Sequence, residues 1–144
     1  MKKILVALFS AILCTCVLAL AEESSNQSVQ INLIDLAGQK SLDAKDGLNI
    51  TQVASGKNAS VNLVMGSPGS ILKMHYHQYS DEITYCIKGQ AAMNVSGKKL
   101  VMKAGDLMYI PALVLHGSEV TGNETLQLIS IFTPPFDGKD RIYV

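Results

Sequence analysis

The stretch from Gly69 to Gly89, GSILKMHYHQYSDEITYCIKG, decides both the fold and the chemistry of this chain. Within it, two runs of strand length flank a short polar connection. Period-two alternation points the rings of His75 and His77 to one face of the first strand. Glu82 opens the second strand, and a hairpin-like return would bring its carboxylate beside the two rings.

The only other histidine is His116, which lies in a later run. A single histidine in a strand is more often a hydrogen-bonded structural group, and Glu82 alone is readily a solvated carboxylate. Two imidazoles and a carboxylate at this spacing are instead what a divalent transition metal needs. We therefore favour a metal site over chance clustering, although spacing alone does not bring His116 to it.

Runs of strand length, rich in Val, Ile, Leu, Tyr and Thr, continue through the chain, separated by Gly, Asp, Asn and Pro turns. They are Val29 to Leu36, Leu48 to Ala54, Ser60 to Met65, Ile71 to His77, Glu82 to Ile87, Ala91 to Val95, Lys99 to Lys103, Leu107 to Ile110, Val114 to Val120 and Thr125 to Phe132. No long amphipathic helix is expected. This pattern predicts an all-β, single-domain protein, with a jelly-roll β-barrel as the natural candidate.

The stretch from which we began resembles the first motif of the cupin superfamily, G-x5-H-x-H-x4-E-x6-G. All its fixed positions are present, as Gly69, His75, His77, Glu82 and Gly89. The chain is similar to the small single-domain type 2 cupins that carry a signal peptide. The resemblance covers roughly residues 60–132 and implies a cupin-type jelly-roll barrel.

The second cupin motif, G-x5-P-x-G-x2-H-x3-N, is matched in part. Gly105, Pro111 and His116 are in place, whereas Leu113 stands for the middle glycine and Val120 for the closing asparagine. The histidine is retained and the details of the turn depart from the family's pattern.

This resemblance implies one divalent transition metal ion inside the barrel. Its ligands would be His75, His77, Glu82 and His116. A six-coordinate metal would keep about two positions free for water, oxygen or substrate. We expect iron first, and manganese, nickel, copper and zinc suit the same ligands.

Parity also predicts which neighbours line the barrel. Ile71 and Lys73 share the face of the two histidine rings, and Thr84 and Cys86 share that of Glu82. Lys73 could clamp an anionic substrate, but a lysine near a strand start more often extends into solvent. Cys86 is best interpreted as a small buried hydrophobe. Residues 133–141 are interpreted as a surface loop folded over one barrel end.

Residues 1–21 have the pattern of a signal peptide: a basic start, an apolar stretch and a small-residue cleavage pattern ending at Ala21. A membrane anchor, or a lipid anchor at Cys14 or Cys16, are the alternatives. Cleavage would leave a flexible lead-in, residues 22–28, before a cupin domain at residues 29–144. We expect a secreted or periplasmic protein.

Cleavage would leave 10 basic and 12 acidic residues, because it removes two of the 12 basic residues, Lys2 and Lys3, and no acid. This balance attracts neither nucleic acid nor an anionic membrane surface, so the expected partner is a small-molecule ligand or substrate. A homodimer is expected from the resemblance alone.

The resemblance favours a metal-dependent enzyme of the dioxygenase, isomerase or lyase type. The alternative is a barrel that binds metal or a small ligand without turnover. A metal-free carbohydrate-binding or structural barrel is a third interpretation, which the retention of all four ligand types disfavours.

Overall fold

The structure, a computed structural model, describes residues 28–43 and 45–144. The expected signal peptide, residues 1–21, and residues 22–27 of the expected lead-in lie outside these. In the described part of the chain, no helix has both the length and the apolar character needed to cross a membrane.

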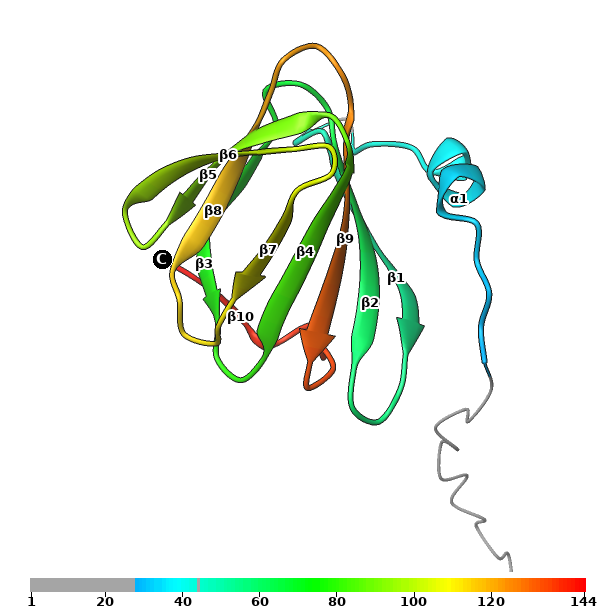
Figure 1. Cartoon of the computed structure of the whole chain (residues 1–144), viewed down its shortest axis with the longest axis vertical. Helices are drawn as coiled ribbons and strands as arrows, with labels where there is room; N and C mark the ends of the chain where they lie inside the picture. The colour runs from blue at the N-terminus through cyan, green and yellow to red at the C-terminus, as the bar shows by residue number, and fades with distance from the viewer. Residues whose placement is uncertain (1–27, 44) are drawn as a thin grey trace, which may run out of the picture.

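Two antiparallel five-stranded sheets face each other and form the barrel (Figure 1). The first has the order β1 (Leu48–Ser55), β2 (Ser60–Gly66), β9 (Leu126–Thr133), β4 (Asp81–Lys88), β7 (Leu107–Ile110). The second has the order β10 (Arg141–Tyr143), β3 (Ile71–His77), β8 (His116–Thr121), β5 (Gln90–Val95), β6 (Lys98–Lys103). The prediction of an all-β, single-domain jelly roll is confirmed.

The first expected strand, Val29 to Leu36, is wrong, because the chain forms helix α1 (Leu33–Gln39) there. The side chain of Asn32 accepts hydrogen bonds from the backbone N–H groups of Ile34 and Asp35, at 3.0 and 3.3 Å. These bonds satisfy donors that a helix leaves free at its first turn. A local cap therefore outweighs the strand preference of the apolar run.

Helix α1 covers the outer face of the first sheet, on the side of β1 and β2 (Figure 1). Leu33, Leu36 and Ala37 lie three and four residues apart and so share one side of the helix. They pack on a cluster made by the outward side chains of the sheet, namely Leu63, Met65, Ile129, Val53, Val61, Ile87 and Ile131. Strand β2 is consequently buried along most of its length.

The interior of the barrel is apolar at one end. Eight buried residues form this inner cluster: Val64, Cys86, Ala91, Met93, Met102, Val120, Leu126 and Leu128. Burial raises the pKa of the Cys86 thiol, in agreement with its interpretation as an inert hydrophobe. Each large apolar side chain buried in this way stabilises the fold by about 1.5–3 kcal/mol, and the cluster leaves only the other end of the lumen for polar chemistry.

A bulge in β3 changes which of its residues face the lumen. Leu72 pairs with Ser118 and His75 pairs with His116, so β3 has one residue more than β8 between the two pairs. Leu72 therefore faces inward, whereas Ile71 is 57% exposed and Lys73 is exposed. The expectation that Ile71 and Lys73 line the lumen is wrong, because strict alternation fails at a bulge.

The segment after β9 folds over the end of the barrel, as expected, but it also adds a strand that the sequence did not predict. Strand β10 pairs with β3 at the edge of the second sheet, placing Arg141 opposite His77 and Tyr143 opposite His75. Paired residues point to the same side of a sheet. Arg141 and Tyr143 are therefore on the lumen face.

The second motif differs from the family's pattern at Leu113, in the turn between β7 and β8. Leu113, which stands where the motif has glycine, adopts φ +66°, the left-handed region that costs a non-glycine residue about 1–2 kcal/mol. Its N–H donates to the carbonyl of His77 at 2.7 Å, and the neighbouring Ala112 N–H donates to Asp81 Oδ1 at 2.9 Å. Backbone hydrogen bonds thus hold the turn although the glycine is missing.

We predict that Leu113→Gly leaves the free energy of unfolding unchanged or raises it by up to about 1 kcal/mol. Relief of the left-handed backbone offsets the greater freedom of glycine in the unfolded chain. Leu107→Gly is the matched control, because both leucines are 66% exposed but Leu107 lies in a strand, where glycine costs about 0.5–1 kcal/mol. Urea denaturation measures both. Equal destabilisation by the two substitutions would contradict the prediction.

Candidate metal centre

The structure brings together all four side chains predicted from the sequence. His75 and His77 come from β3, Glu82 from β4 and His116 from the start of β8. One ligand atom from each lies within 4.8 Å of the others, and all four residues are buried. Opposite ligands of a metal with bonds of about 2.1 Å lie about 4.2 Å apart, so the cluster has nearly the dimensions of one coordination sphere.

The three imidazole rings are fixed in the same way, each through its Nδ1 atom. Nδ1 of His75 lies 2.7 Å from the carbonyl of Lys73, and Nδ1 of His116 lies 2.8 Å from that of Val114. Nδ1 of His77 lies 3.1 Å from the carboxylate of Asp140. Since these partners are acceptors, each Nδ1 carries a proton, which leaves a lone pair on Nε2 of neutral His75 and His77. Nε2 of His116 faces a second acceptor, Oε2 of Glu82.

These lone pairs fit a cation. Nε2 of His75 and Nε2 of His77 are buried and have no hydrogen-bond partner among the described residues. Nε2 of His116 lies 3.2 Å, and Nε2 of His77 3.7 Å, from Oε2 of Glu82. Unprotonated nitrogens that face a carboxylate repel it unless a proton or a cation lies between them. Three neutral imidazoles and one carboxylate could therefore hold a divalent metal.

The electrostatics of the cluster favour the forms that bind metal. The pKa of His75 is lowered from 6.5 to about 4, mainly because the ring is buried. The hydrogen bond to Lys73 acts in the opposite direction, and the charges of His116 and Arg141 lower the pKa further. Burial also lowers the pKa of His77, although Glu82 opposes this. Burial disfavours ionisation of Glu82, but hydrogen bonding with His116 and Ser130 outweighs it and lowers the pKa of this carboxyl. The neutral forms of His75 and His77 and the ionised form of Glu82 are thus favoured.

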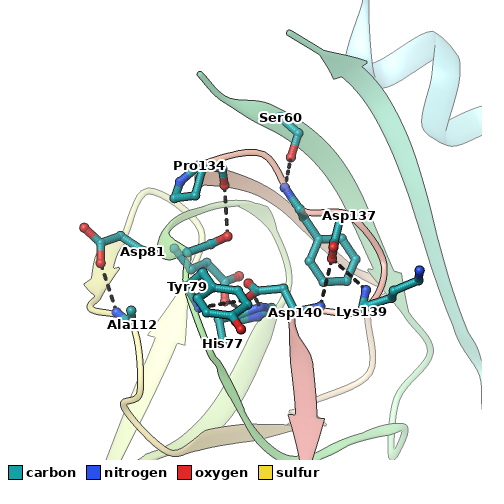
Figure 2. A network of polar contacts seen from close by, with 12 residues as sticks. Ser60, His77, Tyr79, Asp81, Ala112, Pro134, Asp137, Lys139 and Asp140 are labelled. Atoms are coloured by element: carbon teal, nitrogen blue, oxygen red, sulfur yellow. Dashed lines mark hydrogen bonds and ion pairs between the residues drawn. The ribbon is translucent and has the colours of Figure 1, made fainter. Parts of the chain in front are cut away.

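Asp140 is a part of the candidate centre that the sequence did not reveal. Its Oδ2 atom meets Nδ1 of His77, and its Oδ1 accepts the backbone N–H of Tyr79 at 2.7 Å (Figure 2). Asp137 fixes the turn before it by accepting the N–H groups of Lys139 and Asp140 through Oδ1. Because Asp140 lies 63 residues from His77, no local pattern could have pointed to it.

The segment that carries Asp140 is tied to the barrel by further hydrogen bonds. Phe136 N–H donates to Oγ of Ser60 at 2.9 Å, and Oγ of Ser80 donates to the carbonyl of Pro134 at 2.9 Å (Figure 2). The ring of Phe136 lies 5.5 Å from that of His77 between centroids, and Phe132 lies 4.8 Å from it. Two aromatic rings therefore shield one side of the cluster from water.

A small cavity adjoins two of the four side chains, Glu82 and His116. Its volume is about 20 Å³, enough for one or two water molecules. Glu82 and His116 lie in its wall, together with the hydroxyl groups of Thr84, Ser118 and Ser130 and the side chain of Arg141. A molecule in this space would touch the candidate metal ligands and a few polar groups.

Comparison with known proteins agrees with this architecture. Residues 62–132, which include all four side chains, match the family model described as the cupin domain. The structure of KdgF from Halomonas sp. is similar with a TM-score of 0.67 and 23% identity, over 78% of this chain and 97% of that chain. The protein is therefore a single-domain jelly roll of the cupin type. The family match and the shared fold together support its place in the cupin superfamily.

Two curated relatives show the range of this resemblance. Quercetin 2,3-dioxygenase of Bacillus subtilis is 28% identical over 86 residues, which are 57% of this chain and 25% of that protein. The oxalate-binding protein of Thermotoga maritima is 33% identical over 64 residues, which are 44% of this chain and 53% of that protein. The chain spans about half or less of the length of these two relatives.

We predict that Asp140→Asn lowers the affinity for a divalent metal about 10–100-fold. Asp140 accepts two hydrogen bonds through different oxygens, and an amide would turn an N–H group toward one of the two donors. Zinc affinity is measured by competition with a chelating dye. Asp106→Asn is the control, since Oδ2 of Asp106 accepts the N–H of Lys103 at 2.9 Å, which an amide oxygen can also do. An unchanged affinity in folded Asp140→Asn protein would exclude this role.

We also predict that the metal-free protein loses stability as the pH falls below about 6.5. A folded pKa of about 4 for His75 means that the unfolded chain binds the proton first, so acid favours unfolding. The lowered pKa of His77 and that of Glu82 act in the same direction. One pKa unit corresponds to about 1.4 kcal/mol, and we expect His75 to contribute roughly 2 kcal/mol of loss between pH 7.5 and 5.

Urea denaturation in the presence of a chelator measures this loss. His75→Gln is the comparison, because it removes the titrating ring and keeps an amide of similar size. A smaller loss in this variant is the expected result. If the variant and the original protein lose the same free energy over this pH interval, the assignment of the loss to His75 is wrong.

Proposed function

We propose that this protein is a metal-dependent enzyme that acts on a small oxygen-bearing molecule at a centre of three histidines and one glutamate. The proposed ligands are His75, His77, Glu82 and His116. The main support is a pair of buried atoms, Nε2 of His75 and Nε2 of His77, which lie in one cluster with a carboxylate. Neither atom has a hydrogen-bond partner within the part of the chain that the structure describes. Such orphaned acceptors are costly unless something binds them.

A divalent metal held by these residues would act as a Lewis acid or oxygen-binding centre with about two positions open. The protein's own part is to keep the rings neutral, as the lowered pKa values of His75 and His77 indicate, and to exclude water. Phe132 and Phe136 serve the second purpose. We expect iron first, and manganese, nickel, copper or zinc would suit the same donors.

The size of the cavity bears on the substrate. Pockets for drug-sized ligands measure about 300–1,000 Å³, whereas the cavity beside Glu82 and His116 measures about 20 Å³. The printed names of the two relatives refer to quercetin and to oxalate. Both molecules are larger than this cavity, and oxalate is by far the smaller of the two. We therefore propose a compact substrate over a polycyclic one.

The alternative function is a barrel that binds metal and a small ligand without turnover. The enclosed cavity and the similarity to a relative named as a binding protein favour it. The two functions require the same four side chains and differ only in whether product is released.

We also propose that the protein acts after export from the cytoplasm. The support is the sequence pattern of residues 1–21. Cys86 is the only cysteine outside that segment, so the expected mature domain needs no disulfide in an oxidising compartment.

Elemental analysis of the purified protein tests the metal centre. We predict one divalent metal per chain, and at least a tenfold loss of metal affinity in both His75→Ala and His116→Ala, because each would lose one directly coordinating nitrogen. Tyr79→Ala, at a residue that is 67% exposed, is the control and retains the metal. A His116→Ala protein with full metal content would contradict the proposed ligand set.

The metal-loaded protein is then screened against oxalate, other small carboxylic acids, phenolics and sugars, with oxygen consumption and product masses as readouts. Turnover of a compact acid or sugar supports the enzyme. Metal uptake with ligand binding but no product in any reaction would support the binding barrel instead.

A further inference from the structure

We propose that Arg141 forms an anion-binding subsite next to the metal centre, and that the ligand of this protein is a compact carboxylate. This inference rests on the proposed function and names the chemical class of its substrate. Nothing in the pattern of the two sequence motifs involves Arg141, because it follows both of them in the chain.

The register of β10 places the arginine. Arg141 pairs with His77 on β3, so its side chain leaves the sheet on the same side as that ring. It lies in the wall of the 20 Å³ cavity that also contains Glu82 and His116. The ring of Phe136 supports the guanidinium from one side, with 5.1 Å between Cζ and the ring centroid. The side chain is therefore held at the cavity and does not extend freely into solvent.

The guanidinium has a buried N–H donor that lacks an acceptor among the described residues. Among residues 28–43 and 45–144, the buried Nε of Arg141 has no hydrogen-bond partner, and no carboxylate forms an ion pair with this side chain. A buried charged donor without an acceptor is costly. A carboxylate fits this need, because its two oxygens match the fork formed by Nε and a terminal nitrogen.

The remainder of the cavity also suits an anion. The hydroxyl groups of Thr84, Ser118 and Ser130 lie in its wall and can donate hydrogen bonds. When the centre holds a divalent cation, the charge of that cation exceeds the single negative charge of Glu82. The volume of about 20 Å³ argues against a large ligand, and the wall offers Arg141 together with two of the proposed metal ligands, Glu82 and His116.

Two nearby lysines, Lys45 and Lys73, lie outside the lumen and cannot bind an anion in the cavity as Arg141 can. The sequence had suggested Lys73 as a clamp, but Lys73 is exposed and lies with Lys45 in the wall of a surface pocket of about 650 Å³. Leu72 borders both this pocket and the cavity of the centre. The two lysines, with Asp46 beside them, therefore belong to the surface pocket, and Arg141 is the cation in the wall of the cavity next to Glu82 and His116.

The experiment uses the fact that Arg141 is the only arginine of the chain. Protein labelled with 15N-arginine gives a single Nε–H signal in NMR spectra. We expect glycolate to shift this signal in the zinc-loaded protein, and glycolamide, which replaces the carboxylate by a neutral amide of the same size, to leave it in place. The metal-free protein shows the same shift at higher glycolate concentration. No shift with glycolate in either form would overturn the proposal.

Calorimetry with variants provides the second readout. Arg141→Met weakens glycolate binding to the zinc-loaded protein at least about 10-fold, the range expected for a lost charged hydrogen bond, and Arg141→Lys restores part of the affinity. Lys139→Met is the control for charge, because it removes an exposed cation two residues away and leaves binding unchanged. Equal affinity of Arg141→Met and the original protein for glycolate would overturn the proposal.

Zinc content, determined on the same samples, separates the two levels of inference. A glycolate-dependent shift without zinc uptake supports the subsite and rejects the metal centre. Zinc uptake without any shift rejects the subsite and leaves the metal centre standing.

Discussion

The centre depends on one constraint: three imidazole rings inside a closed barrel have their Nδ1 atoms committed to acceptors. Two of these acceptors are backbone carbonyls, of Lys73 and Val114, and the third is the carboxylate of Asp140. With the proton fixed on that side of each neutral ring, the Nε2 lone pairs converge on Glu82. Electron-rich atoms in so little space are stable together only when something positive joins them. Because the barrel buries all four side chains, water cannot readily replace the missing positive charge.

Sequence reasoning succeeded where the chain is locally regular. Alternation along β3 placed His75 and His77 on one face, and the turn after β3 brought Glu82 beside them, as the structure has it. His116 could be assigned only through the resemblance of the second motif. In the structure it pairs directly with His75 across β3 and β8, a contact between residues 41 positions apart that local spacing does not encode.

The failures have equally specific causes. One extra residue in β3 reversed the alternation, so Leu72 took the place in the lumen that parity had given to Ile71 and Lys73. Asn32 supplied a helix cap within a run that resembled a strand. The three-residue strand β10 was too short to stand out from its loop, and with it Asp140 and Arg141 were missed. In each case a single residue or a distant pairing overrode a correct local preference.

The lateness of β10 in the chain has a consequence for how the site forms. The first cupin motif folds from residues close in sequence, whereas Asp140 and Arg141 reach it only across more than 50 residues, after β9 is in place. Contacts of such long range close slowly, because the entropy of the intervening loop must be lost first. A chain folded only as far as β4 therefore has His75, His77 and Glu82. The ring of His77 is still free to rotate, because Asp140 is not yet in place to fix it. The hydrogen bond that fixes the ring of His77 is therefore one of the last parts of the candidate metal centre to form.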